Sequence, residues 1–180
     1  MLLTEENIAH CLAKAQESHS PPENPYKPLI PTGQPRLAAV LIPFFWKENE
    51  WHLLFIRRTI NNTDRHGGQV AFPGGQSESG DDTPQATALR EAQEEIGIAR
   101  KDITILGQLQ DVMTITNFQV TPIVGSIPWP HTLSSQDEEV SRIFSIPLSW
   151  LMKPENREVR HHDIQFQGQP IPVIHFSPYD

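Results

Sequence analysis

The stretch from Gly74 to Ile98 limits the fold of this chain more than any other part of the sequence. Thr83 is a favoured N-cap residue, Pro84 suits the first helical position, and Gly97 suits the left-handed residue that ends a helix. Together they predict a helix over residues 84–96, a normal length for a globular protein.

This helix has an apolar side and an adjoining acidic side. At about 100° per residue, the three glutamates fall within an arc of about 100°. Like charges this close repel one another, and a bound cation would reverse the sign of that interaction. Carboxylate oxygens suit the hard cations Mg²⁺ and Mn²⁺, whereas a solvated acidic face is the alternative interpretation. The apolar set is Ala88, Leu89, Ala92 and Ile96, and the acidic set is Glu91, Glu94 and Glu95.

A glycine pair upstream of the helix favours the interpretation of the acidic side as a cation site that acts on a phosphate compound. Gly74 and Gly75 follow the short apolar run 70–72, and a strand, a glycine turn and a helix in this order let backbone N–H groups approach a phosphate. The whole stretch resembles the Nudix box, whose pattern is G, five residues, E, seven residues and then REUxEExGU, with U aliphatic. Residues 90–98, REAQEEIGI, fit its second half.

The first half departs from that pattern. Five residues after Gly75 stands Asp81 instead of Glu, and eight residues, not seven, separate Asp81 from Arg90. The linker therefore carries one extra residue and a shorter acid, which leaves Asp81 as an accessory acid of unassigned role.

A second signature precedes the glycines. It is similar to that of the coenzyme A pyrophosphatase subgroup, roughly LLTxR[SA], three residues, R, three residues, G, three residues, FPGG. Leu53, Leu54 and Arg57 match its start, and Gly68 and the run 72–75 match its end. The second arginine stands one place late, at Arg65, so the preceding loop is longer than the pattern.

Basic residues gather before the glycine turn. Arg57, Arg58 and Arg65 form the densest positive cluster of an acidic chain, and the guanidinium fork can hold a phosphate through two hydrogen bonds. We therefore predict that these arginines, with Gly74 and Gly75, bind the substrate. The alternative for Arg57 and Arg58 is a place at a strand end, paired with neighbouring acids.

The resemblance implies an enzyme and its site. It implies hydrolysis, with Mg²⁺ or Mn²⁺, of the diphosphate bond of a nucleoside diphosphate linked to another moiety, most readily coenzyme A, giving 3′,5′-ADP and 4′-phosphopantetheine. Glu91, Glu94 and Glu95 would hold the metal, with Arg90 orienting them by ion pairs, and the base would be a helix glutamate or Glu139. Two alternatives stay open: another Nudix substrate (an oxidised nucleotide, ADP-ribose, NADH or a dinucleoside polyphosphate), and a Nudix module that binds nucleotides without hydrolysing them.

Composition agrees with a single enzyme domain that acts on a small molecule. The chain has 180 residues, 37% of them hydrophobic, which is enough for one sizeable core. A net charge of −8 argues against a nucleic-acid polymer as partner, and no apolar run or leader indicates a membrane. The single cysteine, Cys11, excludes an internal disulfide and makes the reducing cytoplasm the expected location.

The remaining elements favour an α+β fold. Residues 4–16 predict a helix, capped by Thr4, in which Cys11 is one of the packed residues. The apolar runs 36–45 and 51–57 predict a hairpin covered on both faces, and further strands are expected at 103–109, 120–127, 158–166 and 171–176, with a short helix at 147–152. His161 and His162 would point to opposite faces of their strand, so they would not chelate one metal.

The resemblance then implies a Nudix-like α/β/α sandwich with a mixed, curved central sheet. Residues 1–33 would form an N-terminal helix and a proline-rich extended segment, and residues 34–180 the Nudix domain. Nudix domains generally close with a second substantial helix. Its place either stays unfilled here or is taken by the N-terminal helix.

Overall fold

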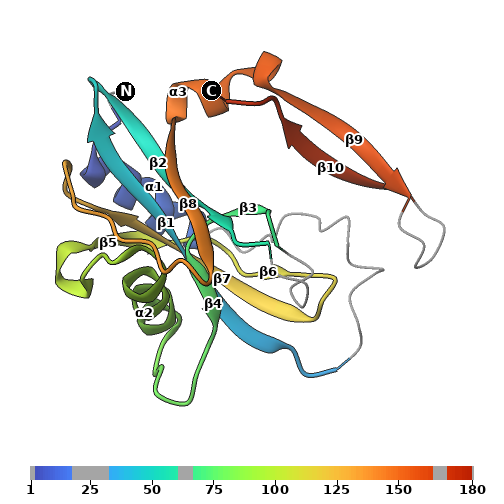
Figure 1. Cartoon of the computed structure of the whole chain (residues 1–180), viewed down its shortest axis with the longest axis horizontal. Helices are drawn as coiled ribbons and strands as arrows, with labels where there is room; N and C mark the ends of the chain where they lie inside the picture. The colour runs from blue at the N-terminus through green and yellow to red at the C-terminus, as the bar shows by residue number, and fades with distance from the viewer. Residues whose placement is uncertain (1–2, 18–32, 61–66, 164–169, 180) are drawn as a thin grey trace.

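A mixed β-sheet forms the centre of the protein (Figure 1). The computed structural model describes residues 3–17, 33–60, 67–163 and 170–179. The sheet contains β1 (Arg36–Lys47), β2 (Glu50–Arg58), β3 (Val70–Ala71), β4 (Gly74–Gln76), β5 (Thr104–Gln108), β6 (Val112–Met113), β7 (Phe118–Ser126) and β8 (Val140–Pro147). Its main path runs β3-β2-β1-β7-β5, while β4 pairs with β1, β6 with β7 and β8 with β2.

The glycine pair lies inside this sheet, where two strands diverge. β1 and β2 form an antiparallel hairpin, but they pair only from Phe44 opposite Leu53 to Lys47 opposite Glu50. Beyond that point β3 pairs with β2 and β4 pairs with β1, so the segment 70–76 fills the gap between them. The next neighbour of β1 is β7, which runs parallel to it and makes the sheet mixed.

Helix α2 (Pro84–Ile96) covers one face of the sheet and has the predicted bounds. The Thr83 hydroxyl accepts a hydrogen bond from the Ala86 N–H at 3.1 Å, and Gly97 ends the helix at φ 73°. Its apolar side is buried in the main core, which also contains Ala39 and Leu41 of β1. The helix is therefore positioned by its caps and by its alanines, which let it approach the strands closely.

Helix α1 (Glu5–Glu17) covers part of the opposite face. Ile8 and Leu12 pack against Val124, and partly buried residues of β1 at positions 42 and 44 join this second core. Side chains alternate along a strand, so these positions face away from Ala39 and Leu41. The N-terminal helix therefore lies on the face of the sheet opposite α2. This agrees with the alternative in which it takes the place of a second substantial helix.

One expectation for α1 is wrong. Cys11 is exposed, because the apolar contact of α1 with the sheet is formed by its buried residues Ile8 and Leu12. These two residues are four positions apart, so their side chains lie one above the other on a narrow stripe. Cys11 directly precedes Leu12, so its side chain is turned about 100° around the helix axis from that of Leu12.

The C-terminal part forms a separate hairpin beside the sheet (Figure 1). Trp150 of α3 packs against Phe176 and Tyr179, with ring centroids 6.4 and 5.1 Å away, which holds this part of the chain to the short helix. The elements are α3 (Leu148–Met152), η3 (Pro154–Asn156), β9 (Arg157–Asp163) and β10 (Pro170–Phe176); η2 (Arg100–Asp102) lies earlier, after α2.

The predicted α+β sandwich with a mixed sheet is confirmed, but three strands were not predicted: the short β4 and β6, and the longer β8. β8 pairs along β2 from Pro147 opposite His52 to Val140 opposite Arg58. The proline-rich segment lies outside the described residues, apart from its last residue, so the division at residue 33 stays a prediction. Within the described ranges, no helix has the length and apolar character that crossing a lipid bilayer requires.

Candidate active site

Glu95 is a buried carboxylate held against the glycine turn. Its side chain is 1% exposed, and its Oε2 accepts a hydrogen bond from the Gly74 N–H at 2.9 Å. Burial raises the pKa of the Glu95 carboxyl to about 7; the charges of Glu91 and Glu139 act in the same direction, while the Gly74 bond and Arg58 oppose it. The Gly74 N–H thus serves a carboxylate of α2, whereas the sequence suggested that it would face a phosphate.

Glu91 lies beside the second glycine. Its side chain is 14% exposed, and Oε1 is 2.9 Å from Nη1 of Arg90. A Cβ atom on Gly75 would collide with the Glu91 carboxylate, so only glycine lets this carboxylate lie against the β4 backbone. Burial raises the pKa of Glu91 above its ordinary value, although Arg90 opposes the shift.

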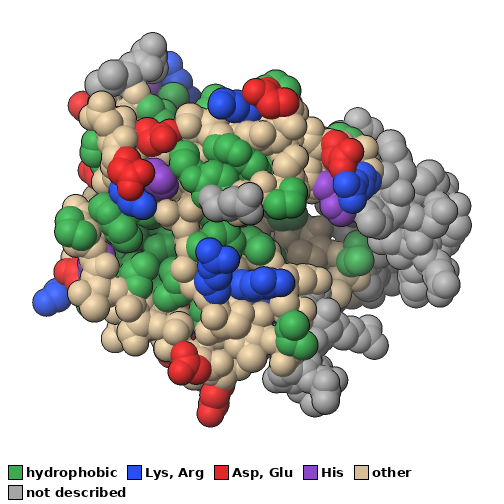
Figure 2. All heavy atoms as spheres, turned by 45° about the horizontal axis from the view of Figure 1, so that its top comes forward, with side chains coloured by type: hydrophobic (Ala, Val, Ile, Leu, Met, Phe, Trp, Pro, Cys, Tyr) green, Lys and Arg blue, Asp and Glu red, His purple; other side chains and the backbone are tan. Residues whose placement is uncertain are grey.

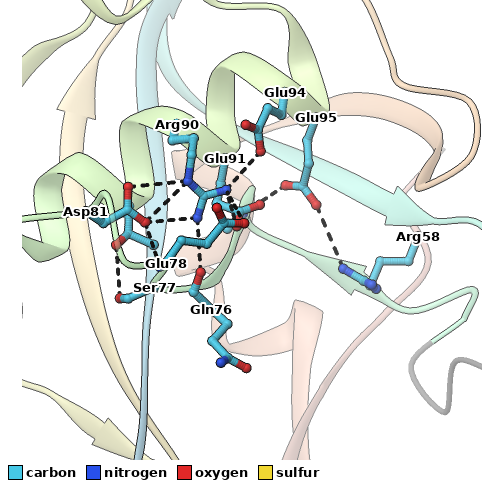
Figure 3. A network of polar contacts seen from close by, with 11 residues as sticks. Arg58, Gln76, Ser77, Glu78, Asp81, Arg90, Glu91, Glu94 and Glu95 are labelled. Atoms are coloured by element: carbon cyan, nitrogen blue, oxygen red, sulfur yellow. Dashed lines mark hydrogen bonds and ion pairs between the residues drawn. The ribbon is translucent and has the colours of Figure 1, made fainter.

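Arg90 connects most acids of the site (Figure 3). Its Nη1 is also 2.9 Å from Oε2 of Glu94, and its Nη2 is 3.0 Å from Oδ2 of Asp81. The hydrogen bonds from Arg90 hold the pKa of Asp81 below its ordinary value, and these ion pairs raise the pKa of Arg90 itself. The ion pairs expected of Arg90 are therefore present, and Asp81, which is 4% exposed, belongs to them.

These residues border an open depression of about 410 Å³. One wall is the carboxylate side of α2, and another is Arg58 at the end of β2, whose Nη1 lies 3.8 Å from Oε1 of Glu95. Asp81 does not line it but contacts two residues that do, Arg90 and Glu78. The lining residues are Arg58, Gly74, Gly75, Glu78, Arg90, Glu91, Glu94, Glu95, Gln136 and Glu139.

The predicted arginine cluster is divided between two faces. Arg58 lines the depression, whereas Arg57 lines a different cavity on the opposite face of the sheet. Consecutive residues of a strand point to opposite faces, and this rule applies to Arg57 and Arg58 as it does to the histidine pair. Arg65 lies outside the described residues, and so do the side chains of His161 and His162.

The loop at residues 134–139 closes one side of the site, a role that the sequence did not predict. The Gln136 N–H donates to the Glu95 carbonyl at 3.3 Å, and the Ser134 N–H donates to the Ile96 carbonyl at 3.1 Å. The Thr59 N–H donates to the Glu139 carbonyl at 2.9 Å, which joins this loop to the end of β2. The loop satisfies carbonyl groups that the helix end leaves unpaired and places Glu139 at the depression.

The positions of Glu91 and Glu95 fit a hard divalent cation, whereas the Glu94 side chain lies apart from them. Glu95 is buried and Glu91 is 14% exposed where both border the depression, and burial raises the pKa of each carboxyl above its ordinary value. Glu94 is 51% exposed and turned to Arg90. Among the described residues, no three His, Cys, Asp or Glu side chains converge as metal ligands. Mg²⁺ commonly takes only one or two protein carboxylates, with water and substrate oxygens as the other ligands.

The buried charge of Glu95 predicts a pH-dependent stability of the metal-free protein. The pKa of Glu95 is raised from 4.5 to about 7 in the folded protein. The stability that its protonated carboxyl contributes is therefore fully present below pH 4.5 and is lost as the pH rises through about 7. In a chelator, Glu95→Gln should therefore be more stable than the parent at pH 8, by on the order of 1–3 kcal/mol, and equal to it at pH 4.5. Urea unfolding across this range measures the difference.

The matched control is Glu94→Gln, which removes the same charge from an exposed position of the same helix. A stability difference between Glu95→Gln and the parent that does not change with pH would contradict the assignment of Glu95 as a poorly stabilised buried charge.

The fold and the site together define a class of protein: a mixed sheet between helices, with a carboxylate-bearing helix packed against a glycine turn. The NUDIX domain model matches residues 35–165. An uncharacterized Nudix hydrolase NudL from Enterobacter sp. (strain 638) is 42% identical over 135 residues, which cover 74% of this chain and 67% of that protein. The protein of the same name from Yersinia enterocolitica is 46% identical over 111 residues, 62% of this chain and 56% of that protein. The chain belongs to the NUDIX family.

Solved structures agree on the fold. An Ap4A hydrolase from C. elegans has a TM-score of 0.53 at 17% identity and covers 63% of this chain and 81% of its own. The NUDIX domain of NrtR from Shewanella oneidensis, complexed with ADP ribose, has a TM-score of 0.51 at 16% identity and covers 78% and 85%. At such identities the likeness shows the fold alone. The matches to the two NudL proteins span between 56% and 67% of those relatives' lengths.

Proposed function

We propose that this protein hydrolyses the diphosphate bond of a nucleoside diphosphate linked to another moiety, with Mg²⁺ or Mn²⁺ as cofactor. Nudix hydrolases act on substrates of this kind and generally use such metals. The observation that carries the proposal is the pair of carboxylates at the edge of an open depression, Glu95 buried and Glu91 largely so, each with a pKa that burial raises. A location in the cytoplasm is part of the proposal.

Glu91 and Glu95 would hold the metal, with Glu94 reaching it only by leaving its ion pair with Arg90. When bound, the cation neutralises diphosphate charge, activates a water molecule and stabilises the leaving oxygen. Arg90 restrains the Glu91 carboxylate through its 2.9 Å contact, and the Gly74 N–H restrains that of Glu95. These restraints fix the donor oxygens before substrate arrives, which lowers the reorganisation that the reaction requires.

Arg58 and the acids at the rim supply the remaining chemistry. The Arg58 guanidinium lies at the depression and can donate hydrogen bonds to a diphosphate oxygen. Glu139 stands across from the helix glutamates, and either it or one of them accepts the proton of the attacking water. The P–O–P bridge then breaks, and the leaving phosphate carries away the bridging oxygen.

Coenzyme A is the substrate that we propose within this class. The support is the signature that includes Leu53, Leu54 and the run 72–75, which resembles that of coenzyme A pyrophosphatases. Water would attack the diphosphate, giving 3′,5′-ADP and 4′-phosphopantetheine. Neither the names of the relatives nor the likeness to solved structures identifies a substrate.

A comparison of coenzyme A with dephospho-coenzyme A tests this substrate. The two differ only in the 3′-phosphate, whose charge requires a cationic partner. A charge-assisted contact of about 1.5–3 kcal/mol predicts that kcat/KM is about 10- to 150-fold higher for coenzyme A. Product chromatography on both substrates, with Mg²⁺ and with Mn²⁺, measures this ratio. Equal values would move the function to the broader class of ADP-linked substrates.

The same measurement on a panel separates the other outcomes. It contains ADP-ribose, NADH, an oxidised nucleotide and a dinucleoside polyphosphate. Preferred turnover of one of these would keep the reaction and replace the substrate. Measurable nucleotide binding without turnover of any compound would show a binding module instead of an enzyme.

A further inference from the structure

A second cavity, of about 820 Å³, lies on the face of the sheet opposite the carboxylates. Its floor is formed by β2, β3 and β8, and the C-terminal hairpin with the tail up to Tyr179 forms another wall. Figure 2 shows the surface hollowed between the body of the molecule and this hairpin, with basic side chains beside the hollow. This size is within the range of sites that bind small molecules.

Three aromatic rings at the floor are stacked on one another, with Phe55 in contact with both of the others. The ring centroids of Phe55 and Phe72 are 4.8 Å apart at an interplanar angle of 23°, and those of Phe55 and Phe144 are 5.8 Å apart at 24°. All three rings are only partly buried. A planar heterocycle can extend such a stack by lying on the face of an outer ring, Phe72 or Phe144.

Two arginines lie directly opposite each other beside these rings. Arg57 of β2 pairs in register with Arg142 of β8, two residues along from the pair formed by Phe55 and Phe144. Like charges in directly opposite positions of an antiparallel pair are destabilising. No carboxylate among the described residues forms an ion pair with either guanidinium. Arg57 Nε donates to the Gly68 carbonyl at 3.3 Å, and the Arg142 guanidinium lies 5.5 Å from the centroid of the Phe144 ring.

The lining of the cavity differs in charge from the rest of the protein. The described residues that line it include Arg57, Arg142 and His175, and none of them is Asp or Glu, although the chain carries a net charge of −8. A bound anion between the guanidiniums would replace their repulsion by two charge-assisted contacts. The cavity therefore combines a stacking surface with an anion site.

We propose that this cavity binds a phosphorylated nucleoside, with the base on the phenylalanine rings and the phosphate between Arg57 and Arg142. The identity of this ligand rests on the proposed function: it is the 3′-phosphoadenosine end of coenzyme A. The other end of that substrate, the pantetheine arm, is an uncharged chain and would offer the two guanidiniums no anionic partner.

The position of the cavity is compatible with one extended substrate. Arg57 and Arg58 are consecutive, so their Cα atoms are about 3.8 Å apart, while their side chains leave the strand on opposite faces. Phe72 lines the cavity and Gly74 lines the carboxylate depression, only two residues further along the same segment. A ligand that passes around the end of β2 reaches the aromatic cavity with its base and the carboxylates with its diphosphate.

Calorimetric binding of 3′,5′-ADP to the full chain in a chelator tests the proposal without turnover. We expect Arg57→Ala and Arg142→Ala each to weaken binding by about 10-fold or more, the loss of one charge-assisted contact. Arg100→Ala, which removes an exposed arginine of η2, should leave the affinity unchanged. The affinity for 4′-phosphopantetheine should not change in Arg142→Ala. Equal affinity for 3′,5′-ADP in the parent and in Arg142→Ala would overturn the proposal.

Unfolding measurements on the same variants exclude a trivial loss of structure. Because Arg142→Ala removes a like-charge pair, its thermal midpoint should equal or exceed that of the parent. The substrate and the cavity can be rejected separately. If the parent binds 3′,5′-ADP through Arg142 but does not hydrolyse coenzyme A, the nucleotide site in the cavity is supported and coenzyme A is rejected as substrate. If the parent prefers coenzyme A and Arg142→Ala keeps the whole preference, coenzyme A is supported and the nucleotide site in the cavity is rejected.

Discussion

Glu95→Gln should lower kcat at least about a hundredfold on any substrate that the parent hydrolyses, because one oxygen of the bound cation's ligand set loses its charge. The replacement has nearly the same shape, and its side-chain oxygen can still accept the hydrogen bond from the Gly74 N–H. The loss of activity should therefore come from turnover and metal affinity and not from unfolding, since the same replacement is expected to stabilise the metal-free protein above pH 7. Turnover measured at saturating Mg²⁺ and Mn²⁺ gives the first quantity, and metal titration by calorimetry gives the second.

Glu94→Gln is the matched control for this prediction. Glu94 stands next to Glu95 in the sequence but is 51% exposed and paired with Arg90, so its replacement should cost much less activity than that of Glu95. If Glu95→Gln turned over at the parental rate in saturating metal, the metal assignment would be wrong. If Glu94→Gln were equally damaged, the cation would be held by three glutamates, as the helix pattern alone suggested.

The helix that carries the site could be predicted almost completely from the sequence. Thr83, Pro84 and Gly97 act through local backbone geometry, and their spacing determined both ends of α2. The 3.6-residue period likewise separated its apolar side from its acidic side. What the period did not show is that Glu95 is buried and Glu94 is exposed, because that difference comes from the contacts with β4 and with the loop after residue 133.

The parts that were missed depend on contacts between distant segments. β8 carries Ser141 and Arg142 among its apolar residues, so it lacks the continuous apolar run that indicated its neighbours. Its pairing with β2 brings Arg142 opposite Arg57 across 85 positions of the sequence, and no local pattern reports such a pair. The division of Arg57 from Arg58, in contrast, could have been predicted, since alternation along a strand requires only the strand itself.

The departure of the linker from the Nudix pattern now has a structural account. Asp81 stands where the pattern has Glu, after which the loop is one residue longer, yet its carboxylate reaches the Arg90 guanidinium through both Oδ atoms. The Glu78 N–H also donates to Asp81 at 3.0 Å, which closes a tight turn around the acid. The extra residue thus brings a shorter side chain to the arginine, and we propose that Asp81 acts by positioning Arg90.

Breaking this pair should cost the metal-free protein more stability than any other charge substitution in the site. Asp81 is 4% exposed and pairs with Arg90, so Arg90→Gln leaves a buried carboxylate without this partner. Asp81→Asn removes one of several acids that pair with Arg90, which keeps Glu91 and Glu94. Arg90→Gln should lower the free energy of unfolding by about 3 kcal/mol and Asp81→Asn by about 2–3 kcal/mol. Because the pKa of Asp81 is lowered in the folded state, its stabilisation is present above its ordinary pKa of 3.8 and is lost as the pH falls below that value.

A double-mutant cycle identifies the interaction itself. Once one partner is gone, the second replacement has little left to remove, so the double variant should cost clearly less than the sum of the two single variants. Asp82→Asn and Arg100→Gln change the same kinds of residue at exposed positions and should each stay within about 0.5 kcal/mol of the parent. Urea unfolding in a chelator at pH 7 gives all four corners of the cycle. Additive costs would show that Asp81 and Arg90 stabilise the protein independently, and Asp81 would then have no part in positioning the arginine.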